Sequence, residues 1–427
     1  MSYSRNIGHN ILTQLLKIVF GVLTGVIVAR ALGPSGQGYI AYIVLIFTLL
    51  GTFGHFGITN AVAYFQKKSG FERGAIFSTN LNVLALISLC LGIVVLSLHQ
   101  MGLFLQAYST LYVLGGILML SATLFLGHHQ SWMMGDEKII RSNNIGLLVF
   151  FLKSGLILLL WLFGGLGPWP FFLVTVMAAF LWSILILREV RERYLPLISM
   201  AVLKAELGYG IVAWSAALFA YLHYRADQIM IKNMLGNSEL GVYTVAVTIA
   251  ELLFLFPVSI NSALSGRLYN LQQQDDARSI LSKTMRVSMI VCVGLFPLGV
   301  LGSFLIPLVY GAPYAEATGL MLILLPGVLF ACVPKILSPW FFSSGRPMVH
   351  LRITFLCLAL NIMLNVLFIP LWGSRGAAFA STLSYILYGV YYLCLMRYSE
   401  SFSFGSLLKP RRADLQILSR LIKGAHS

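Results

Sequence analysis

Long uninterrupted runs of apolar residues extend through most of this chain. A bilayer core about 30 Å thick needs roughly 20 apolar residues per helix, and the chain offers about 12 runs of that length. The runs do not alternate as barrel strands do, and helices satisfy their own backbone groups in lipid. Only 10% of the 427 residues are charged, whereas 58% are hydrophobic. The sequence therefore predicts an all-α polytopic membrane protein.

The first run follows the polar segment "MSYSRNIGHN", which lacks a small-residue cleavage pattern, so we expect this helix to be retained. The expected spans are residues 9–31, 39–65, 76–98, 108–133, 140–163, 168–187, 207–231, 242–264, 285–310, 316–343, 349–371 and 375–397.

The formal charge of +15 could suggest a nucleic-acid partner. However, most of the 29 Lys and Arg residues fall at the N-terminus, in loops after even-numbered spans or in the C-terminal tail. Only Arg30, Lys232 and Arg375 lie in loops on the other side. This asymmetry follows the positive-inside rule with both termini in the cytoplasm. We therefore interpret the charge as a topological signal and expect no nucleic-acid partner.

A short motif recurs in the two halves of the chain, "LGPSGQG" from Leu32 and "LGNSELG" from Leu235. The alignment that pairs Gly33 with Gly236 also pairs Gly38 with Gly241. Both copies connect the first two spans of a half, where glycine permits a tight turn with positive φ. The alternative is a chance similarity between two helix hairpins, which the equal number of spans in each half disfavours.

The longest hydrophilic interruption, residues 188–207, divides the chain almost equally. An even number of spans in each half predicts two six-helix bundles related as a parallel repeat. We expect a first bundle over 1–194, a second over 195–398 and a basic cytoplasmic tail over 399–427. Within the tail, apolar residues such as Leu415 and Leu418 share one face beside arginines, which predicts an amphipathic surface helix. A disordered basic tail is the alternative.

Known catalytic and metal-binding patterns are missing from the sequence. It contains no Walker-type loop, no Ser-His-Asp or H-E-x-x-H spacing and no C-x-x-C pair. The adjacent His128 and His129 more often have a local polar role than a ligand role. We therefore expect no catalytic residues, no metal and no cofactor, and an ion gradient or the substrate itself would supply the energy.

Ionisable residues inside spans are costly and tend to mark a pathway. The cations Lys17, Lys153, Arg225 and Lys335 are expected to line a cavity that binds an anionic substrate, because arginine can hold phosphate oxygens with two parallel hydrogen bonds. Snorkelling of the long side chain to the headgroups is the alternative for Lys17. For Lys153 and Lys335 the alternative is a better-hydrated position nearer the end of a span. The acids Asp227 and Glu251 are the candidates for coupling to H⁺ or Na⁺, although Glu251 could also hydrogen-bond a neighbouring helix.

Several segments together resemble the Wzx-type polysaccharide repeat-unit flippases of the multidrug/oligosaccharidyl-lipid/polysaccharide exporter (MOP) superfamily. They are "ARALGPSGQGYIAY", "RADQIMIKNMLGNSELGVYTVA", "LVYGAPYAEATGLMLIL", "SSGRPMVHLRI" and "NIMLNVLFIPLWGSRGAAFASTLSY". The family motifs carry over to Arg30, Gly33, Gly38, Asp227 and Gly236. The other charged residues are assigned here from their position in spans alone.

The resemblance implies two bundles that alternately open to either face of a bacterial inner membrane. They would move an undecaprenyl-pyrophosphate-linked oligosaccharide to the outer leaflet for O-antigen, capsule or exopolysaccharide assembly. The implied partners are this lipid, the membrane lipids and polysaccharide polymerase or assembly proteins. Two alternatives are a drug or metabolite antiporter of the same superfamily and a polymerase or ligase of lipid-linked sugars. The intramembrane charges, mostly basic, disfavour the antiporter, and the short outer loops disfavour the enzyme.

Overall fold

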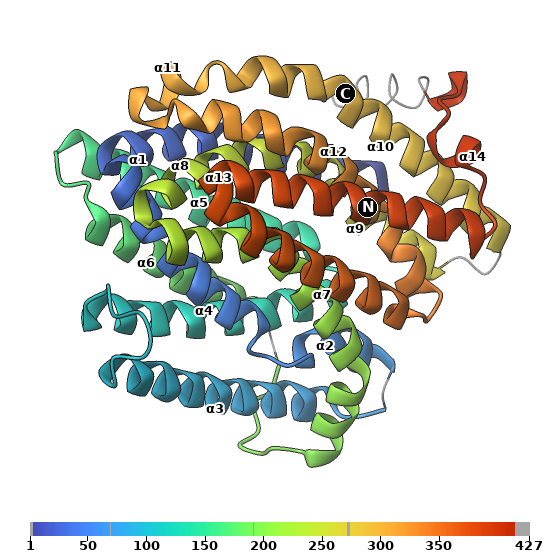
Figure 1. Cartoon of the computed structure of the whole chain (residues 1–427). Helices are drawn as coiled ribbons and strands as arrows, with labels where there is room; N and C mark the ends of the chain where they lie inside the picture. Colours follow the sequence, from blue (N-terminus) through green and yellow to red (C-terminus); the bar gives the residue numbers. More distant parts are fainter. Residues whose placement is uncertain (1–2, 69, 191, 271–273, 415–427) are drawn as a thin grey trace. The chain divides into compact units, whose positions relative to one another are not determined.

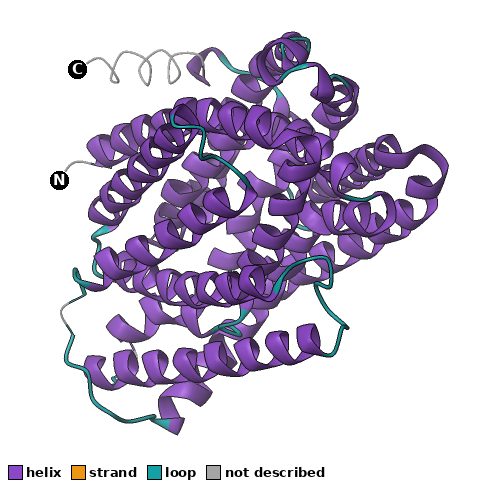
Figure 2. Cartoon of the chain, turned by 90° about the vertical axis from the view of Figure 1, so that its left-hand side faces the viewer, coloured by secondary structure: helices purple, strands orange, loops and turns teal. Residues whose placement is uncertain are grey.

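The computed structural model describes residues 3–68, 70–190, 192–270 and 274–414, and within these residues every regular element is helical (Figure 2). The order along the chain can be followed in Figure 1. The helices are α1 (Tyr3–Phe53), α2 (Ile58–Lys68), α3 (Arg73–Gln100), α4 (Thr110–Gly135), α5 (Ile139–Leu162), α6 (Pro168–Leu187), α7 (Met200–Leu235), α8 (Asn237–Ala250), η1 (Glu251–Phe254), α9 (Leu255–Asn270), α10 (Gln274–Ser303), α11 (Ile306–Tyr310), η2 (Ala312–Tyr314), α12 (Glu316–Ser343), α13 (Pro347–Tyr398) and α14 (Phe404–Leu408).

Ten helical stretches among the described residues are long and apolar enough to cross a membrane, where the sequence predicted about twelve spans. Two of the long helices contain a kink, at Gly33 in α1 and at Gly373 in α13. Helix α13 has 52 residues, and at about 1.5 Å per residue it is far longer than a bilayer core. A glycine kink lets such a helix change direction, and the number of crossings stays a prediction.

Two predicted spans are interrupted. The span expected over 39–65 breaks between α1 and α2, where Gly57 has a φ of 99°. The span expected over 242–264 is divided by the 3-10 turn η1, which begins at Glu251. Helix α7 begins at Met200, inside the hydrophilic stretch that the sequence assigned to a connection. Hydropathy could not place these breaks because each depends on backbone turns within an apolar or mixed segment.

The chain forms two compact units. Unit 1 comprises Met1–Ile18, Gly33–Gly38 and Phe219–Ser427, and unit 2 comprises Val19–Leu32 and Tyr39–Leu218. The first half of α7 therefore packs with unit 2 and its second half with unit 1. The sequence predicted boundaries of two helix bundles and a tail after residues 194 and 398, and these bundle boundaries stay a prediction.

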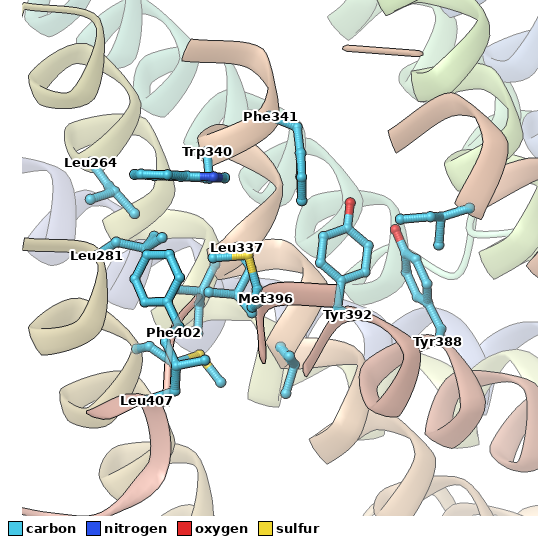
Figure 3. Close-up of a cluster of buried hydrophobic side chains, with 14 of the residues drawn as sticks. Leu264, Leu281, Leu337, Trp340, Phe341, Tyr388, Tyr392, Met396, Phe402 and Leu407 are labelled. Atoms are coloured by element: carbon cyan, nitrogen blue, oxygen red, sulfur yellow. The ribbon is translucent and has the colours of Figure 1, made fainter. Parts of the chain in front are cut away.

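A cluster of large apolar side chains fills the interior of unit 1 (Figure 3). Trp340 and Phe341 of α12 are at most 2% exposed and pack against Tyr392 of α13. Phe402 lies edge-on to the Trp340 ring, with ring centroids 5.4 Å apart. Because Phe402 and Leu407 follow α13, this core fixes the chain after the last long helix onto α10 and α12.

Unit 2 has a smaller apolar core, made by α2, α3, α4 and the start of α7. It includes Phe77, Trp132 and Val202. Gly210 of α7 lies so close to the α1–α2 bend that an added Cβ would be 2.1 Å from the carbonyl oxygen of Gly57. These contacts hold the first half of α7 against unit 2.

The two copies of the glycine motif adopt matching conformations and meet within unit 1. Gly33 and Gly236 have φ values of 64° and 96°, which L-residues rarely adopt. An added Cβ on Gly38 would lie 1.8 Å from the carbonyl oxygen of Asn237, and one on Gly241 would lie 1.9 Å from that of Pro34. The second glycine of each copy therefore permits backbone contact with the other copy. Arg30, just before the first copy, is exposed.

Candidate functional site

A charged site in unit 1 is centred on the second half of α7. The sequence His223-Tyr224-Arg225-Ala226-Asp227 is helical, so Arg225 and Asp227, two residues apart, project from different faces. Arg225 lies toward η1, whereas Asp227 lies toward α8 and α13. The two charged groups therefore belong to separate sets of contacts, as the sequence analysis expected from their spacing.

Arg225 and Glu251 form a bidentate ion pair. Arg225 Nη1 donates to Glu251 Oε1 and Nη2 donates to Oε2, each over 2.8 Å. The 3-10 turn that begins at Glu251 brings this carboxylate back to α7. Their side chains are 25% and 20% exposed, so the pair is reachable from outside the packed interior. The parallel geometry is the one that arginine uses for carboxylate and phosphate groups alike.

Lys335 of α12 completes the charged site. Its ammonium nitrogen lies 4.2 Å from the centroid of the Tyr224 ring and 4.1 Å from that of Phe254. Such cation–π contacts stabilise an ammonium group that has left water. The backbone carbonyl of Lys335 accepts a hydrogen bond from Asn261 of α9. Among the described residues Lys335 forms no ion pair, so the cluster carries two cationic groups and one carboxylate.

Asp227 is almost fully buried, at 1% exposure, and is held by neutral donors. Its Oδ2 accepts from Tyr243 at 2.5 Å and from Ser381 at 2.8 Å, and its Oδ1 accepts from the backbone nitrogen of Gln228 at 2.7 Å. Three donors can stabilise an isolated carboxylate in a protein interior. Nearby on α13, Asn361 donates to Ser381 and extends this polar network.

The other two predicted cations, Lys153 and Lys17, are not among the residues described at this site. Lys153 is in α5 of unit 2, with its ammonium 5.7 Å from the Phe171 ring centroid. Lys17 is in helix α1, but its side chain lies outside the described residues. Within unit 1, the structure brings Arg225, Glu251 and Lys335 together.

The charged site has properties that suit an anion more than a metal. Among the described residues, no group of three or more His, Cys, Asp or Glu side chains is arranged to hold a metal ion. The guanidinium of Arg225 and the ammonium of Lys335 offer donors to oxyanions. The two hydrogen bonds to the Glu251 carboxylate fix the orientation of the Arg225 guanidinium.

Sequence reasoning missed the groups that support these charges. The Tyr224 and Phe254 rings contact Lys335, and Asn261 fixes its backbone. The adjacency of Tyr224 to Arg225 was a usable signal, but pairing across α7, η1, α9 and α12 depends on the tertiary fold. A buried acid, Glu206, was missed because it lies in the hydrophilic stretch assigned to a loop.

The fold identifies the class of protein. The structure of "Lipid II flippase MurJ, inward closed conformation" matches 96% of this chain and 91% of its own with a TM-score of 0.71 at 17% identity. A multidrug resistance MATE family transporter of the MOP superfamily, in an inward-facing conformation, matches 92% of this chain and 98% of its own, with a TM-score of 0.67 at 14% identity. The chain thus has the fold of multi-pass MOP transporters.

The family follows from the sequence. The family model described as "Polysaccharide biosynthesis protein" matches residues 27–318, so the chain belongs to this family, and the model described as "Lipid II flippase MurJ" matches residues 228–423. The resemblance noted from the sequence motifs is confirmed at this level, and the comparisons group the chain with transporters and flippases rather than with enzymes.

Two curated relatives match part of the chain. The "Probable low-salt glycan biosynthesis flippase Agl15" of Haloferax volcanii is 24% identical over 42% of this chain and 38% of the relative. The "Capsular polysaccharide biosynthesis protein CapF" of Staphylococcus aureus is 26% identical over 40% of this chain and 44% of the relative. The matched region thus spans about two fifths of each relative's length.

Proposed function

We propose that this protein moves a lipid-linked glycan across the membrane, with the Arg225–Glu251–Lys335 site contacting the phosphate groups of the lipid carrier. The observation that carries the proposal is the part-exposed bidentate fork of Arg225 on a membrane helix, beside an ammonium group without an ion pair among the described residues. A phosphate oxyanion can accept the same two hydrogen bonds that Glu251 accepts. Family membership and the flippase relatives support a glycan as cargo.

The finer proposal follows the sequence analysis. The substrate is an undecaprenyl-pyrophosphate-linked oligosaccharide, and it passes from the cytoplasmic to the outer leaflet of a bacterial inner membrane as two bundles alternate in opening. Both termini lie in the cytoplasm, and reporter fusions after residues 35 and 270 test this, with the first expected outside and the second inside. Lys153 and Lys17 extend the cationic path in this proposal, and Asp227 or Glu251 carries a coupling ion.

The test is complementation of a strain that lacks the gene, with analysis of lipid-linked glycans. Wild type should clear these glycans from the cytoplasmic face, whereas Arg225→Ala and Lys335→Ala should leave them accumulated at least about 10-fold, equivalent to about 1.4 kcal/mol of lost interaction. Lys204→Ala is the matched control because Lys204 is an exposed cation on the same helix, α7.

Two results would contradict the proposal. If the strain without the gene accumulates no lipid-linked glycan, the cargo is wrong, and export of a drug or metabolite becomes the better function for this fold. If Arg225→Ala and Lys335→Ala both restore export as well as Lys204→Ala does, the charged site is not part of the path.

A further inference from the structure

A buried carboxylate in unit 2 has one hydrogen-bond partner among the described residues. Glu206 of α7 and Asn80 of α3 are both 0% exposed, and Asn80 Nδ2 donates to Glu206 Oε1 over 3.1 Å. The two remaining oxygens, Glu206 Oε2 and Asn80 Oδ1, are buried without a donor among the described residues. A buried oxygen that lacks a donor is costly, so two on one contacting pair call for an explanation.

No cation compensates this carboxylate within the described part of the chain. Arg73 of α3 is occupied by Asp136 and Glu192, with a hydrogen bond of 2.9 Å to Asp136 Oδ1. The ring nitrogens of His128 have no partner among the described residues, and Lys204 is exposed. The titratable groups on the surrounding elements include His55, Tyr64, Arg73, His128, His129, Asp136, Glu192, Arg193, Tyr194, Lys204 and Tyr209. An ionised Glu206 would therefore be a buried charge without a counter-ion, which a protein interior strongly disfavours.

We propose that Glu206 and Asn80 form a proton-binding site. With one proton on Glu206 Oε2, the carboxylic acid can donate to Asn80 Oδ1 while its Oε1 keeps the bond from Asn80 Nδ2. The acid and the amide then form a closed pair with two hydrogen bonds, and both unpartnered oxygens are satisfied by a single proton. A hard cation fits less well, because it takes about six oxygen ligands and this pair offers two.

The proton site lies among the hydrogen bonds that attach the α6–α7 connection to α3. Ser78 Oγ accepts from the Leu195 backbone nitrogen at 2.6 Å, and Thr79 Oγ1 accepts from that of Ser199 at 2.9 Å. Loss of the proton would leave a carboxylate facing Asn80 Oδ1, and repulsion between the two would loosen the start of α7 from α3. Protonation therefore stabilises this attachment.

Infrared difference spectroscopy of the full-length protein in lipid nanodiscs, titrated with acid and base in sodium-free buffer, tests the proposal. The wild type should show a protonated-carboxyl C=O band that Glu206→Gln lacks. Glutamine can keep both bonds to Asn80, so this variant should remain folded. Glu72→Gln is the matched control, because Glu72 is an exposed acid that precedes α3, and it should keep the band. In Asn80→Leu the band should persist at a higher frequency, because the acid has lost its amide partner.

Three outcomes would overturn the proposal. Identical spectra of the wild type and Glu206→Gln at every pH would show that Glu206 holds no proton. Loss of the band on adding sodium at constant pH would show a cation site in place of a proton site. If Glu206→Gln does not fold, the Asn80→Leu shift decides: an unshifted band contradicts the acid–amide pair.

Discussion

The two compact units differ in how they accommodate buried acids. In unit 1, Asp414 and Glu400 each contact an arginine, and Asp227 accepts three hydrogen bonds. In unit 2, the buried Glu206 has a single neutral amide partner within the described part of the chain. An acid with a guanidinium or with several donors can remain ionised, whereas an acid with one amide is better accommodated with a proton. The named acids of unit 1 are thus held by charged or multiple donors, whereas Glu206 of unit 2 is placed to take up a proton.

The largest predicted effect concerns the buried ion pair of unit 1. Arg286 and Asp414 are 3% and 1% exposed and contact each other at 2.7 Å. Removal of one partner leaves an uncompensated buried charge, so Arg286→Met should destabilise the protein by about 3 kcal/mol. Thermal unfolding in detergent measures this loss. Lys283→Met, which removes an exposed cation from the same helix, should have little effect. Equal melting temperatures for the two variants would contradict fixed pairing.

Acid should weaken the same contact. The Arg286 guanidinium holds the pKa of Asp414 below its ordinary value. The stabilisation is therefore complete above the unfolded-state pKa, about 3.9 for aspartate, and is lost as pH falls through the lower folded-state value. The melting temperature of the wild type should exceed that of Asp414→Asn at neutral pH, and the difference should shrink below about pH 4. A difference that is constant with pH would mean that Asp414 acts without its charge.

A matched pair of substitutions compares an acid of unit 1, Glu251, with the buried acid of unit 2, Glu206. Glu251→Gln replaces one side of a bidentate ion pair and should cost about 1 kcal/mol, since the pair is partly exposed. Glu206→Gln keeps two hydrogen bonds to Asn80 and should change stability by less than about 0.5 kcal/mol. Both are measured by thermal unfolding at neutral pH. A larger loss for Glu206→Gln would show that Glu206 makes interactions that a neutral amide cannot replace, and the contrast between the units would fail.

The most local predicted effect concerns the neutral hydrogen bonds beside Glu206. Ser78→Ala removes the acceptor of the Leu195 backbone nitrogen and should cost about 1 kcal/mol. Faster hydrogen exchange at Leu195 is the specific readout. Ser97→Ala is the control, because Ser97 is exposed on the same helix. Unchanged exchange at Leu195 in Ser78→Ala would show that the connection is not attached in this way.

The sequence was sufficient for features that depend on local composition. Apolar runs predicted membrane helices, and the family motifs predicted the polysaccharide biosynthesis family. It could not predict which distant charges meet. Arg225 and Glu251 pair because a 3-10 turn interrupts an apparently continuous span, and Asp414 contacts Arg286 across most of the second half of the chain. The burial of Glu206 could not be predicted, because the hydropathy of residues 188–207 does not indicate that α7 begins at Met200. Leu415 and Leu418, part of the predicted surface helix, lie outside the described residues.

Translocation by the purified protein in lipid vesicles tests the central claim most directly. A fluorescent lipid-linked oligosaccharide diphosphate is placed in the inner leaflet, and its arrival outside is followed with a quencher that does not cross the membrane. We predict that wild type and Lys204→Ala move the lipid, whereas Arg225→Ala moves it at least about 10-fold more slowly. Translocation by Arg225→Ala at the wild-type rate, or none by the wild type above empty vesicles, would contradict the account.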